Sequence, residues 1–242
     1  MALGHDRLIR KLESATGLTV EEAAAVRNLP LKPRRVEAEA EVVREGDRPT
    51  ESCLLVEGCL VRQKVTPEGR RQILSIHTPG DFADLQSIHL PVMDHSIVAV
   101  GSGTVAFVPH AEIEALWRRH PSLAQAFWRE ALTDAAIHRE WICNVGARPA
   151  YQRTAHLLCE FFLKMQVIGL TTGRRCPFPL SQRDLADCMG LSPVHVNRTL
   201  QQLRAADLIL LSGKVLTVPD FAALQAAGQF DPTYLHLRRG AA

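Results

Sequence analysis

Residues 181–204 read SQRDLADCMGLSPVHVNRTLQQLR, and this stretch contains the start signals of two helices in succession. Ser181 and Ser192 are residue types that cap helix N-termini, and Pro193 suits the first turn of the second helix. Gly190 stands between the two patterns, where its free backbone permits a tight turn. We therefore predict two short helices joined by a turn at Gly190.

The apolar residues of the second helix fall on one side of it. Val196, Leu200 and Leu203 recur at the i, i+4 and i+7 positions, which predicts a buried stripe. Ala186 in the first helix is small enough to let the two helices cross closely. This spacing predicts a helix-turn-helix, whose second helix is free to enter the major groove of DNA.

The outer face of the second helix carries side chains suited to DNA. Arg198 suits guanine, Asn197 suits adenine or phosphate, and Val194 suits the thymine methyl group. The alternative for each is an ordinary solvated helix face. The starts of the two helices and a hairpin that follows them are expected to add phosphate contacts. The predicted DNA-binding residues are Ser181, Gln182, Ser192, Pro193, Val194, His195, Asn197, Arg198, Gln201 and Lys214.

That hairpin follows the second helix. Residues 205–218 read AADLILLSGKVLTV, which predicts two short strands around Ser212 and Gly213. Such a hairpin is the wing of a winged helix, and Lys214 at its tip is placed to meet backbone phosphate.

The N-terminal part has a different texture. Residues 1–31 contain two short helical patterns, and from residue 32 short apolar runs alternate with turns. Glycines recur at intervals of 12, 11 and 11 residues, at Gly46, Gly58, Gly69 and Gly80. Short strands joined by glycine turns are typical of an antiparallel sandwich or jelly roll.

A long helix is predicted between the two parts. Residues 122–143 run about six turns without glycine or proline, and NVGARP at 144–149 predicts a break and a hinge. Steps of four and three residues along it form a heptad pattern that we call the seam. We expect it to pair with a second copy, the alternative being packing on its own sandwich. The seam residues are Trp128, Ala131, Ala135, His138 and Ile142, continuing from Ala124.

The predicted fold is therefore α+β, with four parts. These are N-terminal helices (1–31), a jelly-roll sensor domain (32–120), a dimerisation helix with its hinge (121–145) and a winged helix-turn-helix domain (146–242). Residues 149–242 contain 10 lysines and arginines against six acids, or +4, whereas residues 1–148 contain 18 against 20, or −2. A basic C-terminal part suggests contact with a polyanion.

The composition of the chain indicates a globular protein without membrane-spanning segments. With 46% hydrophobic and 22% charged residues the chain is typical of a globular protein, and no apolar run is long enough for a membrane span. No secretion signal is recognisable at the start, so we expect a cytoplasmic protein whose six cysteines are reduced thiols. The histidines of residues 77–110 are too scattered for a metal-dependent jelly-roll enzyme, so we expect no metal and no enzymatic activity.

These features together resemble the CRP/FNR superfamily of bacterial transcription regulators. The resemblance extends from about residue 32 to 218 and is carried by VEGCL at 56–60, TPGDF at 78–82, HSIVAV at 95–100, QRTAHLLCE at 152–160 and the helix-turn-helix. It implies a homodimer joined along the long helix, a palindromic DNA site with half-sites about one turn apart, and RNA polymerase as a further partner.

The resemblance also indicates an effector pocket, in which this chain departs from cyclic-AMP-binding members. By position the pocket would include Asp84, His95, Ser96, His138 and Arg139. His95 stands where those members carry an arginine, and a neutral histidine lacks the two-point clamp that arginine gives a phosphate. We therefore do not expect cyclic AMP as the effector.

The resemblance raises three further expectations about cofactors and base readout. The first 52 residues contain no cysteine, which excludes the iron–sulfur cluster of the oxygen-sensing branch. His77, His89 and His95 are possible haem ligands, but ordinary histidines are the better interpretation, so no cofactor is expected. Val194 replaces a glutamate that many members use in the recognition helix, so the usual half-site is not expected.

Regulation stays open at this point. Cys188 lies in the first helix of the helix-turn-helix, where oxidation near the DNA would weaken binding, and the alternative is a small buried thiol. A small ligand or thiol oxidation could gate the protein, or the ligand-free dimer could already be competent. A sensor or scaffold module without DNA binding is the more distant alternative.

Overall fold

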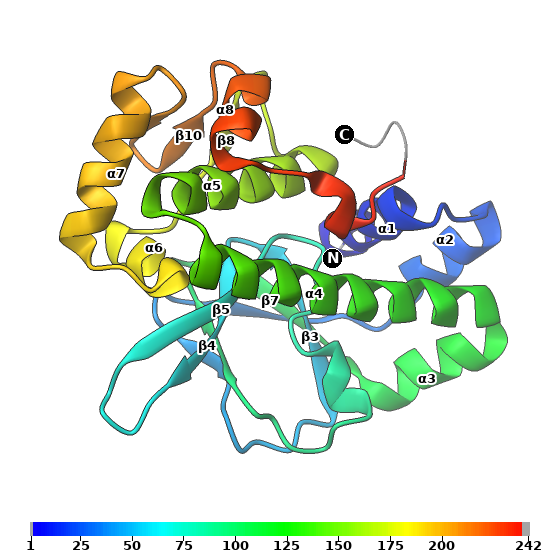
Figure 1. Cartoon of the computed structure of the whole chain (residues 1–242). Coiled ribbons are helices and arrows are strands. Elements are labelled where there is room, and N and C mark those ends of the chain that lie inside the picture. Colours follow the sequence, from blue (N-terminus) through cyan, green and yellow to red (C-terminus); the bar gives the residue numbers. More distant parts are fainter. Residues whose placement is uncertain (1, 239–242) are drawn as a thin grey trace.

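The computed structural model describes residues 2–238, and its N-terminal part is a roll of two antiparallel sheets (Figure 1). The first sheet has the order β1-β7-β3, with β1 (Lys32–Val36), β7 (Gly103–Pro109) and β3 (Glu51–Glu57). The second has the order β2-β6-β4-β5, with β2 (Glu41–Val43), β6 (Ser96–Ala99), β4 (Leu60–Val65) and β5 (Arg71–His77). A short 3-10 helix, η1 (Leu85–Ile88), lies between β5 and β6.

The second sheet is buried on both faces. Leu60 and Ile97 belong to the core between the two sheets, whereas their neighbours Val61 and Val98 belong to a separate core shared with the C-terminal helices. Successive side chains of a strand point to opposite faces. The consecutive apolar residues of these strands, Leu60–Val61 in β4 and Ile97–Val98 in β6, therefore reflect two cores, one on each side of the sheet.

Five helices surround the roll and lead out of it. They are α1 (Ala2–Ala15), α2 (Val20–Arg27), α3 (His110–Arg119), α4 (Pro121–Ala147) and α5 (Ala150–Val167). The long helix breaks within the predicted stretch 144–149, although α4 passes through Gly146 and ends at Ala147. Arg148 is extended, as expected for the residue before Pro149.

The C-terminal part is a winged helix. Its elements are β8 (Arg175–Pro177), α6 (Gln182–Met189), α7 (Pro193–Ala205), β9 (Leu210–Ser212), β10 (Val215–Thr217), α8 (Phe221–Gly228) and η2 (Pro232–Leu235). The three strands form one sheet in the order β8-β10-β9. In Figure 1 the long α4 crosses the molecule between the roll and α5, and α7 lies at one edge.

The predicted α+β fold is confirmed, with an antiparallel roll, a long helix and a winged helix-turn-helix in that order. The division into four domains stays a prediction, and residues 239–242 of the last one lie outside the described residues. Within residues 2–238, no helix is both long enough and apolar enough to cross a membrane.

Gly228, at the end of α8, packs directly against the backbone of α5. A Cβ atom there would lie 2.6 Å from the backbone nitrogen of His156. We expect Gly228→Ala to lower the free energy of unfolding by about 1–3 kcal/mol, the usual cost of overpacking a core. Urea unfolding of the full chain would measure this change.

Gly146→Ala is the matched control, because a Cβ atom at Gly146 would meet nothing within 4 Å. Gly146 lies in a helix, so this variant should be neutral or more stable by up to about 1 kcal/mol. Equal unfolding free energies for the two variants would contradict the close packing of α8 on α5.

Candidate nucleic-acid interface and sensor cavity

The two helices of the helix-turn-helix start as the sequence predicts. The Ser181 hydroxyl accepts a hydrogen bond from the Asp184 backbone N–H at 3.1 Å, and the Asp184 carboxylate accepts one from the Ser181 backbone N–H at 2.9 Å. The Ser192 hydroxyl accepts from the His195 backbone N–H at 3.2 Å. Gly190 between the helices has a φ of +61°, a conformation that favours glycine.

The outer face of α7 presents the predicted base-reading side chains to solvent. Val194 is 81% exposed, and Asn197, Arg198 and Gln201 are exposed beside it, while His195 is half-buried. The opposite face, formed by Val196, Leu200 and Leu203, is fully buried. A DNA groove could therefore reach α7 without any rearrangement of the domain, although contact with DNA itself stays a prediction.

The predicted phosphate-binding positions flank this helix. Ser181, Ser192 and Pro193 are exposed and Gln182 is half-buried. Lys214 is exposed at the tip of the wing, in a two-residue turn in which both Gly213 and Lys214 have positive φ.

Arg183 is a further candidate for a DNA phosphate contact, and the sequence analysis did not identify it. It is exposed, and it lines the same groove as Ser181 and Lys214, between the winged helix and the roll. The available signal was a lone arginine one position after Gln182, which by itself does not distinguish a phosphate contact from a solvated side chain.

The long helix α4 carries an exposed apolar stripe, which we define as Trp128, Leu132, Ala135 and Ile142. The three large members are 61%, 53% and 73% exposed in that order, a high fraction for large apolar side chains. Arg139 lies on the same face. The stripe keeps the predicted steps of four and three residues.

Two predicted seam positions lie elsewhere on α4. Ala131 and His138 are half-buried and line a cavity beside the roll, which the exposed Ala135 also borders. The reason is angular, because successive residues of a helix are separated by about 100°. Leu132, which the sequence interpretation omitted, takes the exposed place of Ala131.

The cavity lies between the roll, α1 and α4 and has a volume of about 560 Å³. Its ionisable lining comes from the roll, α1, α4 and α5: Lys11, Arg62, His77, Asp81, Asp94, His95, Glu130, Asp134, His138 and Lys164. Burial, followed by the nearby Arg62, lowers the pKa of His77 to about 3 and also lowers the pKa of His95. Both histidines are therefore neutral at physiological pH.

Arg62 on β4 joins the roll to α4 across this cavity. Its guanidinium donates to the Asp134 carboxylate at 2.8 Å, approaches the His138 Nε2 atom at 3.2 Å and donates to the Ala83 carbonyl at 3.0 Å. Burial opposes ionisation of Asp134, but Arg62 and the neighbouring histidines outweigh it and lower the pKa of Asp134 to about 2. The pair is thus charged, and it holds the long helix to the sheet.

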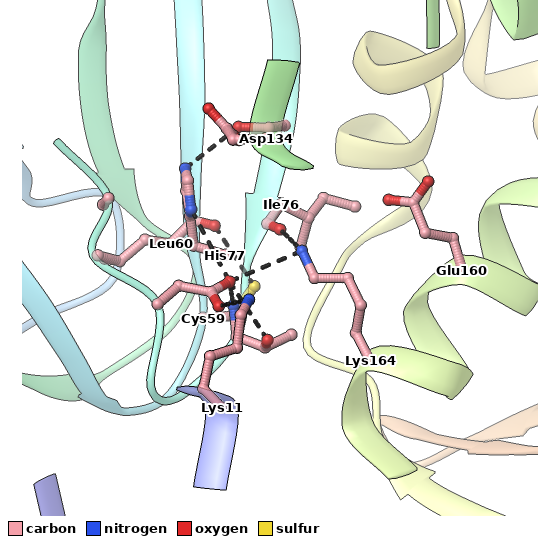
Figure 2. A network of polar contacts seen from close by, with 12 residues as sticks. Lys11, Cys59, Leu60, Ile76, His77, Asp134, Glu160 and Lys164 are labelled. Carbon is pink, nitrogen blue, oxygen red and sulfur yellow. Dashed lines mark hydrogen bonds and ion pairs between the residues drawn. The ribbon is translucent and has the colours of Figure 1, made fainter. Parts of the chain in front are cut away.

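A second ionic group, centred on Asp81, also lines the cavity. The Asp81 carboxylate pairs with Lys11 of α1, lies 3.7 Å from the Lys164 Nζ atom of α5 and accepts from the Thr78 backbone N–H at 2.9 Å. Burial would raise the pKa of Asp81, but the two lysines outweigh it and hold that pKa below its usual range. Figure 2 shows Lys11 and Lys164 reaching this network from two different helices.

Only two of the five predicted pocket residues line the cavity, namely His95 and His138. Ser96 instead donates to the Glu41 carboxylate at 2.6 Å, on the side of β2. Arg139 is exposed on α4. These two residues do not line the cavity, because neighbouring positions of a strand or helix face different sides, and their place in an effector pocket stays a prediction.

Asp84 also lies outside the cavity. Its side chain is fully buried in the roll, where one carboxylate oxygen accepts from the Cys53 backbone N–H at 2.6 Å and the other has no partner among the described residues. Burial raises the pKa of Asp84 to about 7, even though this hydrogen bond and Arg62 favour the charged form.

Cys188 does not match the predicted redox position. Its side chain is 1% exposed and faces the shared core rather than the DNA-facing surface. Burial raises the pKa of this thiol well above its usual value, which opposes formation of the reactive thiolate. The alternative interpretation, a small buried thiol, agrees with this structure.

Comparisons with known proteins agree with this geometry. A cyclic nucleotide-binding domain model matches residues 33–120, and a Crp-like helix-turn-helix domain model matches residues 152–227. The nitrogen fixation regulation protein FixK of Bradyrhizobium diazoefficiens is 27% identical over 209 residues, 85% of this chain and 86% of the relative. A probable transcriptional activator of Rhizobium leguminosarum is 25% identical over 193 residues, 79% of each chain.

Among solved structures, FixK2 from Bradyrhizobium japonicum shares the fold, with a TM-score of 0.73 at 22% identity over 82% of this chain and 98% of that one. The roll, the long helix and the helix-turn-helix thus occur together in the order that defines one class of bacterial regulator. The chain belongs to the CRP/FNR family, and it is a DNA-binding transcription regulator.

The raised pKa of Asp84 predicts a pH dependence of stability. Its folded pKa, about 7, lies above the unfolded value, so its protonation stabilises the fold at low pH. This contribution is lost as pH rises from about 4 to about 7, at no more than about 1.4 kcal/mol per pH unit.

Asp84→Asn removes the titration but keeps an acceptor for the Cys53 backbone N–H. The stability of the wild type relative to this variant should therefore fall between pH 5 and pH 7, as measured by urea unfolding at each pH. Asp47→Asn is the control, because Asp47 is exposed. Parallel pH profiles for the wild type and Asp84→Asn would contradict the assignment.

Proposed function

We propose that this regulator acts as a homodimer that reads a palindromic operator with α7 from each copy. The observation that carries the proposal is that one chain exposes two separate surfaces of the kinds that such a dimer needs. One is the outer face of α7, with Val194, Asn197 and Arg198, and the other is the apolar stripe of α4. A symmetric pair along α4 would cover the stripe and present two copies of α7 to successive turns of DNA.

We further propose that the dimer binds DNA without cyclic AMP. The three cations of the cavity already have carboxylate partners in the chain, Lys11 and Lys164 with Asp81, and Arg62 with Asp134. A nucleotide phosphate would have to displace these pairs. Arg62 bridges the sheet and α4, the two elements that an effector between them would otherwise join.

The remaining expectations belong to the same proposal. The protein would work in the cytoplasm, would have no enzymatic activity or resident cofactor, and would act on transcription together with RNA polymerase. Family membership supports the action on transcription, whereas the absence of a cofactor is an expectation from the sequence, because members of this family differ in whether they bind one. Within residues 2–238, no three metal-ligating side chains cluster in a way that could hold an ion.

The test is selection of DNA from a random pool with the full-length, ligand-free and reduced protein. We expect enrichment of a palindrome whose half-site centres lie about 10 base pairs apart. Salt-sensitive nonspecific binding without enrichment would mean that an effector is required, and would overturn the ligand-free mechanism. Absence of any DNA binding would overturn the proposal as a whole.

Alanine substitutions of Arg198 and Lys214 should change DNA binding in different ways. Arg198→Ala should lower affinity by about 1–3 kcal/mol per half-site and relax specificity at one base pair in each half-site, because each copy would lose a contact to a base edge. Lys214→Ala should weaken binding to all sequences alike and reduce the salt slope by about two, because the dimer would lose one phosphate contact in each half-site. Fluorescence anisotropy on the selected site and on its single-base variants separates the two patterns.

Leu132→Glu tests the dimer surface. A charge at the centre of the apolar stripe would be buried without a partner on pairing, so we expect the variant to sediment as a monomer where the wild type sediments as a dimer. Val65→Glu is the control, because Val65 is a 51% exposed apolar residue on the β4–β5 hairpin. A dimeric Leu132→Glu variant would show that pairing uses another surface.

A further inference from the structure

An ionic contact joins the sensor roll to the first helix of the helix-turn-helix. Arg71 at the start of β5 pairs with two carboxylates of α6: its Nη2 atom with Asp184 and its Nε atom with Asp187, the latter at 2.6 Å. All three side chains are largely shielded from solvent, with side-chain exposures of 25%, 14% and 21%. An arginine that holds two carboxylates has a defined orientation, which a single surface pair lacks.

The next residue of the same strand extends this contact to the backbone of α6. The Gln72 side-chain amide donates to the Asp187 carbonyl at 2.7 Å and to the Cys188 carbonyl at 3.4 Å. These carbonyls belong to the last turn of α6, where the helix has no further N–H groups to satisfy them. Arg71 and Gln72 therefore hold both the side chains and the C-terminal end of α6; we call this contact the clamp.

The clamp ends a few residues before the recognition helix. α6 stops at Met189, Gly190 makes the turn, and α7 begins at Pro193. From the other side, Arg153 of α5 donates to the Met189 carbonyl and, at 2.9 Å, to the Arg148 carbonyl of the hinge. The end of α6 is thus held to the roll by one arginine and to the hinge by another.

We propose that Arg71 is a positioning residue for operator binding, because the clamp sets the orientation of α7 relative to the roll and to α4. Arg71 lies on the roll and does not belong to the DNA-reading face of α7. This inference rests on the proposed dimer, in which the two copies of α7 must match two half-sites simultaneously. A rotation of the winged helix about the hinge would change their separation without changing how one copy fits one half-site.

The proposal predicts a specific pattern of loss in Arg71→Ala. Affinity for the full operator should fall about tenfold, within the range of measured couplings between distant sites. Affinity for a single half-site and for nonspecific DNA should change less than twofold. In a series of operators that differ in half-site spacing, the sharp optimum of the wild type should flatten, which a loss of stability alone would not produce.

Arg70→Ala is the matched control, because the adjacent Arg70 is exposed and its side chain makes no ion pair within residues 2–238. It should keep the wild-type spacing optimum. Asp187→Asn serves as a milder variant if Arg71→Ala folds poorly, since it removes one of the two carboxylates and leaves the Asp184 pair, which also belongs to the α6 cap. It should give an intermediate spacing profile.

A charge exchange distinguishes the clamp from a general effect of the substitution. Arg71→Glu combined with Asp187→Arg restores one ion pair across the same contact, and should recover most of the spacing preference that Arg71→Glu alone loses.

An unchanged spacing optimum in Arg71→Ala and Asp187→Asn, or no recovery in the exchanged pair, would overturn the positioning role. Failure of the wild type to prefer any spacing would instead overturn the proposed dimer function, so the two failures are distinguishable.

Discussion

The outer face of the β2-β6-β4-β5 sheet is apolar and is excluded from water by packing against the C-terminal helices. Val61, Ile73 and Val98 of the sheet share one buried cluster with α4, α5 and the helices of the winged domain. Fully burying a side chain of this size contributes about 1.5–3 kcal/mol. This shared core holds the sensor and DNA-binding parts together. The ionic contacts of Arg62, Asp81 and Arg71 then fix the orientation of the helices relative to the sheet.

The helix-turn-helix was predictable because its signals are local. Caps, a turn glycine and a buried stripe within 24 residues fix two helices and the side of each that faces inward, so the exposure of Val194 and Arg198 followed from spacing alone. The same local logic predicted the strands of the roll. It did not reveal that the second sheet is covered twice, since an apolar run has no period that distinguishes one core from two.

The cavity was predicted poorly because its lining depends on which way each side chain points after the roll has closed. Ser96 is next to His95 in sequence but bonds to Glu41 of β2, and Asp84 turns into the roll to accept a backbone hydrogen bond. Arg62 gave no signal, since a charged residue in a strand usually faces solvent. Its partner Asp134 is 72 residues away in sequence, and a single sequence does not report such pairs.

The doubly covered sheet also bears on how the chain matures on the ribosome. Strands β4 to β6 are complete once residue 99 has been made, but the helices that cover their second face begin only at α4 and continue to residue 228. Synthesis adds about 5–20 residues per second, so this face stays open for several seconds or more. During that interval the nascent roll presents an apolar surface that attracts chaperones or other unfinished chains, and the C-terminal helices end the exposure when they arrive.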